Sequence, residues 1–190
     1  LVAVAQHLTS LIGGQRTAGK VLAEYVHNDR RRDLNRQLRF ENLLPNALGL
    51  ERLVVITTRA TASASELVIN GLRPYIPVVI VGDTTYGKPV GQYSFPFCDQ
   101  VLNPVSFVLK NSLGQADYFT GIPATCPAGD ALDRQLGDPE EASLKEAFVY
   151  VRTGACTPPP PTETTPQPGL RRARTVIQPA DGWQQLLGAH

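Results

Sequence analysis

The sequence predicts an α/β fold in which a short helix joins two buried parallel strands. Two apolar runs of strand length carry this prediction, RLVVITT at residues 52–58 and IPVVIVGD at residues 76–83. Between them, ATASASELVINGLRPY predicts a short helix that ends near Gly71, with Pro74 beyond it. Strand, crossover helix and strand in this order are the repeating unit of α/β domains.

The segments before this unit predict a helix, a strand and a loop. Residues 1–12 have apolar side chains at helical spacing, and Gly13 and Gly14 follow where a helix would stop. KVLAEYV at residues 20–26 alternates partly, as a strand does. HNDRRRDLNRQLRF at residues 27–40 is rich in arginine, but acidic residues are interleaved, which favours a solvated loop over a nucleic-acid-binding patch.

The segments after this unit predict two more strands and a second helix. GQYSFPF at residues 91–97 and NPVSFVLKN at residues 103–111 have strand composition, and a turn follows the second. In residues 137–154, Asp138 suits the N-cap, Pro139 suits the first turn, and Gly154 lies past the helix end. The face of this helix that we expect to be buried consists of Leu144, Phe148 and Val151.

The chain is predicted to consist of one domain and a tail. A length of 190 residues and a hydrophobic fraction of 42% suit a single globular domain, which we assign to residues 1–156. The proline-rich residues 157–169 predict an extended linker, and residues 170–190 a C-terminal tail. The net charge of +1 provides no general attraction to nucleic acid, and the apolar runs are too short for a transmembrane helix.

The three cysteines, Cys98, Cys126 and Cys156, do not form a C-x-x-C motif, and the histidines do not cluster with them. This pattern argues against a zinc site, and we expect no metal. Two interpretations stay open: buried free thiols, or a Cys98–Cys126 disulfide that stabilises the fold by about 3–4 kcal/mol. A disulfide would indicate an oxidising compartment.

The segment VGDTTYGKPVGQ, residues 81–92, approaches the phosphate-binding pattern G-x-x-x-x-G-K-[ST] through Gly82, Gly87 and Lys88. At the position of the magnesium-binding hydroxyl, however, it has Pro89. The segment that follows predicts a strand, whereas a phosphate loop opens a helix. We therefore expect no nucleotide and no other cofactor.

Ser63, in TASASEL, has the surroundings of a nucleophile. Its neighbours are small, and it lies at the start of a predicted helix, where the backbone N–H of Ala64 and the positive helix end would stabilise an oxyanion. The alternative is structural, because Ser63 and Glu66 also form the S-x-x-E pattern of a capping box. Both interpretations remain open from local spacing.

A serine nucleophile needs a base, and Lys88 is the candidate. The three histidines, His7, His27 and His190, show no supporting acid pattern. A lysine must be neutral to accept a proton, and lowering an ordinary lysine pKa of about 10.4 to about 7 requires about 4–5 kcal/mol, which burial can supply. Lys88 follows a buried strand and a glycine-containing turn, although a lysine in a turn is also commonly a surface residue.

Taken together, TASASEL, VGDTTYGK and GQ resemble the carboxyl-terminal processing, or tail-specific, serine peptidases. That family has S-A-S-E, a lysine 25 residues after the nucleophile and a glutamine four residues later, and Ser63, Lys88 and Gln92 match this spacing. The resemblance implies that Ser63 is the nucleophile, Lys88 the general base and Gln92 the residue that orients Lys88. It also implies an oxyanion-hole amide at Ala64 and a ClpP/crotonase-like core of β-β-α units, incomplete at the N-terminus.

The resemblance covers roughly residues 1–155. The family usually has a strand and an Asp-Leu-Arg-x-Asn-Gly-Gly segment, the source of a second oxyanion-hole amide, before a helix like residues 1–12, and it has a PDZ domain. Removing one oxyanion-hole donor costs about 10²–10³ in turnover. We therefore expect residues 1–190 alone to be weakly active or inactive, unless self-association through the tail or the missing N-terminal part supplies this donor.

The expected function is a serine endopeptidase that cleaves protein substrates near their C-termini. The resemblance further implies a bacterial protein in the periplasm or outside the cell, with any membrane anchor beyond this chain. An alternative is a non-catalytic module on a crotonase-like fold that binds a ligand or a protein, and another is an assembly fragment that makes contacts through its proline-rich tail.

Overall fold

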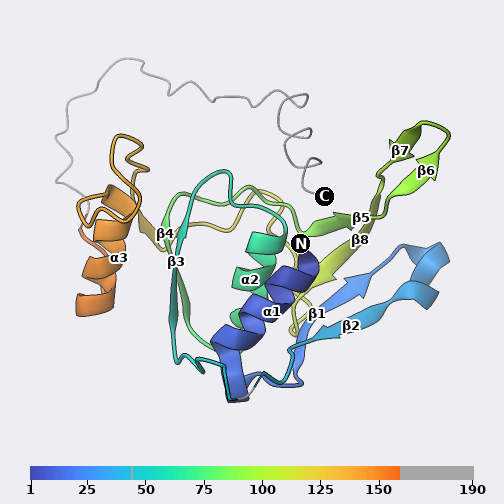
Figure 1. Ribbon diagram of the computed structural model, residues 1–190, viewed down its shortest axis with the longest axis horizontal. Coiled ribbons are helices and arrows are strands. Elements are labelled where there is room, and N and C mark those ends of the chain that lie inside the picture. The colour runs from blue at the N-terminus through green and yellow to red at the C-terminus, as the bar shows by residue number, and fades with distance from the viewer. Residues whose placement is uncertain (44, 159–190) are drawn as a thin grey trace. The chain divides into compact units, whose positions relative to one another are not determined.

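A central helix, α2 (Ala64–Leu72), lies between two β-sheets in the computed structural model (Figure 1). The structure describes residues 1–43 and 45–158. The predicted linker, apart from Thr157 and Pro158, and the predicted tail lie outside the described residues. Within the described residues, no helix is both long and apolar enough to span a membrane.

The first sheet is parallel and contains the predicted crossover unit. Its strands are β3 (Leu53–Thr57), β4 (Val78–Gly82) and β9 (Cys126–Pro127), in the order β3-β4-β9. Strands β3 and β4 pair in parallel from Leu53–Val78 to Thr57–Gly82, with α2 as the connection. The α/β prediction is therefore confirmed for this unit. Because the two strands end side by side, the loops that follow them leave from the same edge of the sheet.

The second sheet is antiparallel. Its strands are β1 (Val21–Val26), β2 (Arg36–Arg39), β5 (Val90–Gln92) and β8 (Val105–Lys110), in the order β2-β1-β8-β5. Strand β2 was expected to be loop. It forms an edge strand with mostly exposed side chains, and such a strand needs little apolar sequence. The preceding arginine-rich residues form a solvent-exposed 3₁₀ segment, η2 (Asp29–Leu34).

The predicted strand at residues 91–97 is in fact two strands of different sheets. Strand β5 ends at Gln92, and β6 (Phe95–Phe97) pairs with β7 (Gln100–Leu102) in a separate hairpin. Between them, the backbone N–H of Tyr93 donates to the side chain of Ser106 instead of to a strand carbonyl, so the ladder stops there. Strand β7 was not predicted.

The remaining helices are α1 (Val2–Gly13), the 3₁₀ turn η1 (Gly14–Arg16) and α3 (Ala142–Thr153). The ends of α1 and α3 agree with their predicted glycine stops, but the predicted N-cap of α3 is wrong. Asp138 accepts a hydrogen bond from the N–H of Glu140 in a preceding turn. Glu141 is the N-cap, because its longer side chain reaches the N–H groups of Ser143 and Leu144.

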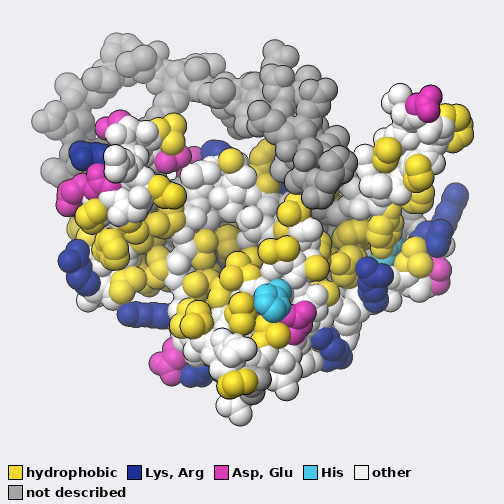
Figure 2. Space-filling view, viewed as in Figure 1, with side chains coloured by type: hydrophobic (Ala, Val, Ile, Leu, Met, Phe, Trp, Pro, Cys, Tyr) yellow, Lys and Arg dark blue, Asp and Glu magenta, His cyan; other side chains and the backbone are white. Residues whose placement is uncertain are grey.

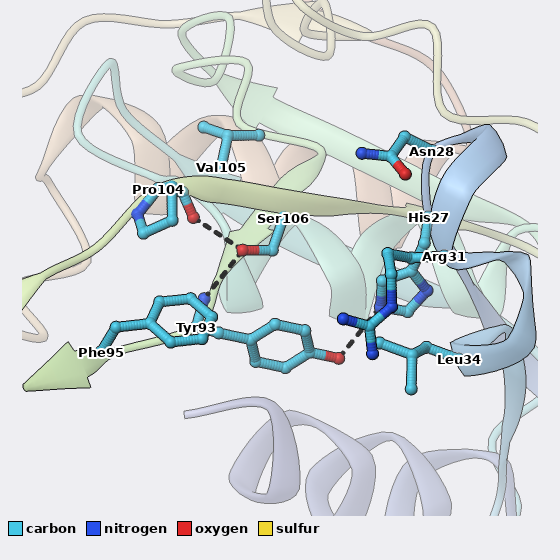
Figure 3. Close-up of a pocket in the computed structure, with 9 residues that line it drawn as sticks. All are labelled: His27, Asn28, Arg31, Leu34, Tyr93, Phe95, Pro104, Val105 and Ser106. Atoms are coloured by element: carbon cyan, nitrogen blue, oxygen red, sulfur yellow. Dashed lines mark hydrogen bonds between the residues drawn. The ribbon is translucent and has the colours of Figure 1, made fainter.

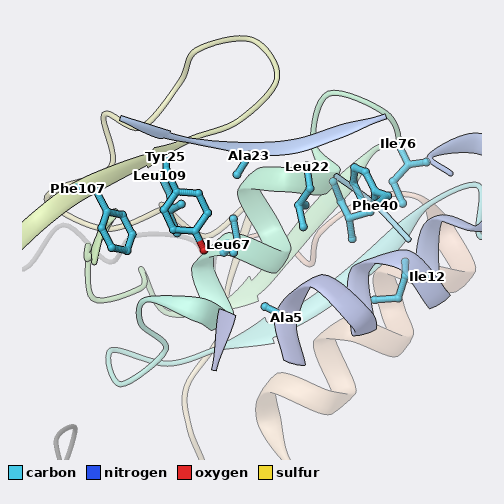
Figure 4. Close-up of a cluster of buried hydrophobic side chains, with 11 residues drawn as sticks. Ala5, Ile12, Leu22, Ala23, Tyr25, Phe40, Leu67, Ile76, Phe107 and Leu109 are labelled. Atoms are coloured by element: carbon cyan, nitrogen blue, oxygen red, sulfur yellow. The ribbon is translucent and has the colours of Figure 1, made fainter. Parts of the chain in front are cut away.

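The core forms on both faces of α2. Leu67 and Leu72 pack with Leu22, Phe40 and other side chains in the cluster between α1, α2 and the antiparallel sheet (Figure 4). Ile69 packs against Ile80 of β4 in a second cluster. With side chains fixed on both of its sides, α2 is held rigidly, and so is its N-terminus.

Helix α3 covers the other face of the parallel sheet. Side chains alternate along β4, so Val79 and Val81 point away from α2 and pack with Ala147 of α3. The predicted buried face of α3 is wrong in part, because the side chains of Phe148 and Val151 are each 45% exposed. Figure 2 shows hydrophobic side chains exposed over α3, at the left of the view, and along the β6–β7 hairpin at the upper right.

The disulfide joins Cys126 and Cys156, not Cys98 and Cys126, and Cys98 is a free, exposed thiol. Both sequence interpretations of the cysteines are therefore wrong. The β6–β7 hairpin carries Cys98 away from the parallel sheet, whereas α3 returns the chain to β9, where Cys126 is completely buried (Figure 1). The bridge thus ties the end of α3 to the strand beside β4.

Replacing Cys156 by serine is expected to lower the free energy of unfolding by about 3–4 kcal/mol, because the disulfide closes a loop of 30 residues. Urea denaturation measures this change, and unsubstituted protein in reductant should match the variant. Cys98→Ser is the control and should leave the stability unchanged. Equal stability of all three proteins would contradict the assigned bridge.

Candidate active site

Ser63 and Lys88 lie in the two loops that leave the carboxyl ends of β3 and β4. The first loop runs over residues 58–63 into α2, and the second over residues 83–89 into β5. The loops begin together, because the N–H of Asp83 donates to the carbonyl of Thr57. Ligands of open α/β sheets bind at this edge, outside the carboxyl ends of the strands.

Ser63 is the N-cap of α2 and has a strained backbone. Its φ of 53° and ψ of −114° lie in a region that residues with a side chain rarely adopt. Such strain costs about 1–3 kcal/mol and is typical of functional sites. The predicted capping box is present, because the Ser63 side chain faces the N–H of Glu66 while the Glu66 carboxylate accepts from the N–H of Ser63. An N-cap residue ordinarily has an extended backbone, so the capping box by itself does not require this strained conformation.

The carboxylate of Glu66 joins the two loops. Its side chain is completely buried, and its Oε2 accepts hydrogen bonds from the backbone N–H of Ser63 at 2.9 Å and of Lys88 at 2.8 Å. The other oxygen, Oε1, accepts from the hydroxyl of Thr85 and from the N–H of Gly87 at 2.7 Å. The backbones of Ser63 and Lys88 thus meet at one oxygen atom.

The same contacts explain why the second loop is no phosphate loop. In a phosphate loop, backbone N–H groups surround the phosphates. Here the N–H groups of Gly87 and Lys88 point at a carboxylate of the protein itself. Gly87 has a φ of 97°, and a Cβ there would lie 2.5 Å from the carbonyl oxygen of Phe119, so the close turn before Lys88 requires glycine.

Lys88 is partly buried, and this desolvation lowers the pKa of its amine from the ordinary value of 10.5. The direction of the shift is the one that a general base requires, since only the neutral amine accepts a proton. Nearby, burial raises the pKa of Tyr118, and the negative charge of Glu66 raises it further. Tyr118 therefore stays neutral beside the loops.

Gln92 is the last residue of β5, and its Nε2 donates to the carbonyl of Asn103 at 2.6 Å. This bond fixes the orientation of the Gln92 side-chain amide: its nitrogen faces the carbonyl of Asn103, and its oxygen faces the other way. The carbonyl oxygen is the end that can accept a hydrogen bond from an amine.

The histidines are engaged elsewhere. His7 Nδ1 lies 2.8 Å from the carboxylate of Glu41, an exposed pair that the sequence did not suggest. His27 is buried between Asn35 Oδ1, 3.1 Å from its Nδ1, and the hydroxyl of Tyr93, 3.0 Å from its Nε2. His190 lies outside the described residues.

One group of three potential metal ligands occurs in the part of the chain that the structure describes, and it consists of Cys126, Glu146 and Cys156. Because the two sulfurs are bonded to each other, this group offers no thiolate to a metal. It lies where the disulfide ties the end of α3 to β9, not in the loops that contain Ser63 and Lys88.

From the sequence, Glu66 is expected only as a capping residue. The S-x-x-E pattern correctly indicates the bond to the N–H of Ser63. It gives no sign that the same carboxylate also binds the loop 21 and 22 residues further along the chain, at Gly87 and Lys88. That contact depends on the parallel pairing of β3 and β4.

Comparison with known proteins gives a family match and several similar structures. The model described as "Peptidase family S41" matches residues 15–110, a range that includes Ser63, Lys88 and Gln92. A putative S41 protease from Bacteroides fragilis is similar with a TM-score of 0.73 and 29% identity, and the match covers 81% of this chain and 42% of that protein. No curated protein sequence matches the chain.

Two other structures are similar in fold alone. A lipoprotein from Streptococcus agalactiae has a TM-score of 0.53 and 15% identity, with 78% of this chain and 48% of that one covered. A putative peptidase from Parabacteroides merdae has a TM-score of 0.51 and 14% identity, with 70% and 42% covered. The chain thus spans less than half the length of each of these structures.

Replacing Glu66 by glutamine is expected to destabilise the fold by about 1–3 kcal/mol, because the amide nitrogen must face at least one buried N–H and leave it unpaired. Chemical denaturation measures this loss. Glu140→Gln is the matched control, since the exposed Glu140 carboxylate pairs with Lys145 at the surface, and it should change the stability by less than about 0.5 kcal/mol. An equal effect of both substitutions would show that Glu66 does not hold the loops together.

Proposed function

Because the chain belongs to peptidase family S41, we propose that it carries the catalytic machinery of a serine endopeptidase that cleaves protein substrates near their C-termini. In this proposal Ser63 is the nucleophile, Lys88 the general base and Gln92 the residue that orients the lysine. The two sheets around α2 then correspond to a ClpP/crotonase-like core.

The single observation that best supports this proposal is the shared hydrogen-bond acceptor of the two loops. Oε2 of Glu66 accepts a hydrogen bond from the backbone N–H of Ser63 and another from the backbone N–H of Lys88. One oxygen atom therefore holds the two backbones close to each other. A side chain reaches several ångströms from its backbone, and the alcohol and the amine therefore have the reach to interact. The strained backbone of Ser63 and the lowered pKa of Lys88 point to the same chemistry.

The proposed reaction begins when the neutral amine of Lys88 takes the proton of Ser63 Oγ as that oxygen attacks the scissile carbonyl. The N–H of Ala64 and the positive N-terminus of α2 stabilise the resulting oxyanion. Lys88 then gives the proton to the leaving amine, which leaves an acyl-enzyme on Ser63. Water resolves the acyl-enzyme, again with Lys88 as the base.

Gln92 suits an orienting role because its amide is uncharged. Its Nε2 is held by the carbonyl of Asn103, so its carbonyl oxygen is the end offered to an amine. A carboxylate in the same position would favour the ammonium form of Lys88 and remove the base.

We also propose an oxidising location, the periplasm or the cell exterior. The Cys126–Cys156 disulfide supports this location, because such bridges persist in oxidising compartments and are rare in the cytosol.

A fluorophosphonate probe should label Ser63 covalently in the intact protein, and mass spectrometry of the labelled peptide identifies the site. Lys88→Ala should lower the labelling rate by about 10²–10⁴, the usual contribution of a general base. Arg59→Ala is the control, because this exposed arginine pairs with Asp83 in the same region. Labelling of another serine, or unchanged labelling in Lys88→Ala, would contradict the proposal and favour a binding module.

The rate of peptide cleavage should rise with pH up to a midpoint below 10.5, because deprotonation of Lys88 activates it and burial lowers its pKa. Gln92→Glu should move this midpoint to higher pH, since the added negative charge stabilises the ammonium. Gln92→Ala, the matched control, should slow cleavage without moving the midpoint upward. A pH profile that is the same in all three proteins would exclude Gln92 as the orienting residue.

A further inference from the structure

A cavity of about 360 Å³ lies at the base of the β6–β7 hairpin, outside the residues proposed for catalysis (Figure 3). One wall comes from residues 27–34, at the end of β1 and in η2, and the other from residues 93–95 and 104–106, beside the hairpin. Its size is in the range of small-molecule and side-chain binding sites, which is about 300–1,000 Å³.

The polar side chains at the base of this cavity are held in place by the protein itself. His27 lies between Asn35 and Tyr93, with its ring stacked 5.9 Å from the ring of Tyr93. The hydroxyl of Ser106 donates to the carbonyl of Pro104 and accepts from the N–H of Tyr93. These bonds give the cavity a fixed shape before any ligand arrives, which lowers the entropic cost of binding.

The sides of the cavity are apolar and partly exposed. Its apolar lining consists of Leu34, Phe95, Pro104 and Val105, and Phe95 and Val105 are 50% and 59% exposed (Figure 3). Covering such side chains with another apolar group is favourable by about 25 cal/mol for each Å² removed from water. The walls therefore favour a ligand with a large apolar side chain.

Arg31 provides the charge. It is the one lysine or arginine among the described residues that line the cavity. Its Nε lies 3.6 Å from Asp33 Oδ1 in a solvent-exposed ion pair, and such exposed pairs are weak enough for an incoming carboxylate to compete with. Four arginines and two aspartates occur within residues 29–36, so the rim has an excess of positive charge. Figure 2 shows basic side chains gathered over η2, beside the hairpin.

We propose that this cavity binds the C-terminal residue of a peptide, with its apolar side chain against Leu34 and Phe95 and its carboxylate on Arg31. The planar guanidinium matches a carboxylate in a two-pronged arrangement, so charge complementarity selects the anionic end of the chain. The choice of a peptide as the ligand rests on the proposed peptidase function. The cavity would then recognise substrate tails separately from the residues that cut them.

The test measures binding without cleavage, in the full chain with Ser63→Ala. The probe is a fluorescein-labelled Gly-Ser peptide that ends in Leu-Phe, prepared with a free C-terminal carboxylate and as the C-terminal amide. Fluorescence anisotropy should give an affinity about tenfold higher for the free acid, as expected when one charge-assisted pair is lost in the amide. Equal affinities for the two forms, or no binding of either, would overturn the proposal.

Two pairs of variants assign the parts of the ligand to residues. Arg31→Gln should abolish the preference for the acid over the amide, whereas Arg30→Gln, at an adjacent arginine that does not line the cavity, should keep it. Phe95→Ser should weaken both peptide forms by the same factor, and Phe97→Ser, in the same strand but outside the cavity, should change neither. Equal effects within either pair would overturn the assigned contacts.

Two further measurements distinguish peptide binding from fatty-acid binding and from the catalytic proposal. Laurate, which carries a carboxylate on an apolar chain, is added as a competitor, and displacement of the peptide at lower concentrations than the unlabelled peptide requires would overturn the peptide as ligand. Fluorophosphonate labelling of the chain with an intact Ser63 tests the catalytic proposal separately. Peptide binding without labelling would contradict the peptidase function and leave the binding site standing. Labelling without peptide binding would contradict the binding site and leave the peptidase function standing.

Discussion

The arrangement of the candidate site depends on one buried charge, the carboxylate of Glu66. An ionised carboxylate taken out of water is very costly unless hydrogen bonds replace its hydration. Four donors do so here, three backbone N–H groups and the hydroxyl of Thr85, and they come from both loops. Neither loop can move away from the other without leaving this charge unsatisfied. The carboxylate therefore keeps the alcohol of Ser63 and the amine of Lys88 on adjoining backbones.

The strained conformation of Ser63 is tolerated because its helix cannot relax. Helix α2 packs through Leu67 and Leu72 on one side and through Ile69 on the other, and all three side chains are buried. A backbone in a sparsely populated region persists when its surroundings determine it more strongly than the local preference does. The two clusters on α2 and the bond from the N–H of Ser63 to Glu66 provide that constraint, so the serine is held in position before a substrate binds.

A short strand connects the candidate catalytic residues with the cavity beside the hairpin. Gln92 ends β5 and belongs to the proposed site, while Tyr93, the next residue, packs against His27 in the wall of the cavity. The chain leaves the strand between these two residues, so neighbours in sequence belong to different sites. The bond from the N–H of Tyr93 to Ser106 ends the ladder here and lets the hairpin diverge.

The sequence by itself determined the features that depend on neighbours along the chain. The apolar runs indicated β3 and β4, the glycines indicated where α1 and α3 end, and the spacing of Ser63, Lys88 and Gln92 indicated the family. Contacts between distant segments were decided by the tertiary structure. It pairs Cys126 with Cys156, makes an edge strand of residues 36–39, and turns Glu66 from a helix cap into the acceptor for a second loop. The physical reason is that local patterns report the backbone preference and burial of a segment, whereas a disulfide, an edge strand or a buried carboxylate depends on which distant atoms the packed sheets bring beside it.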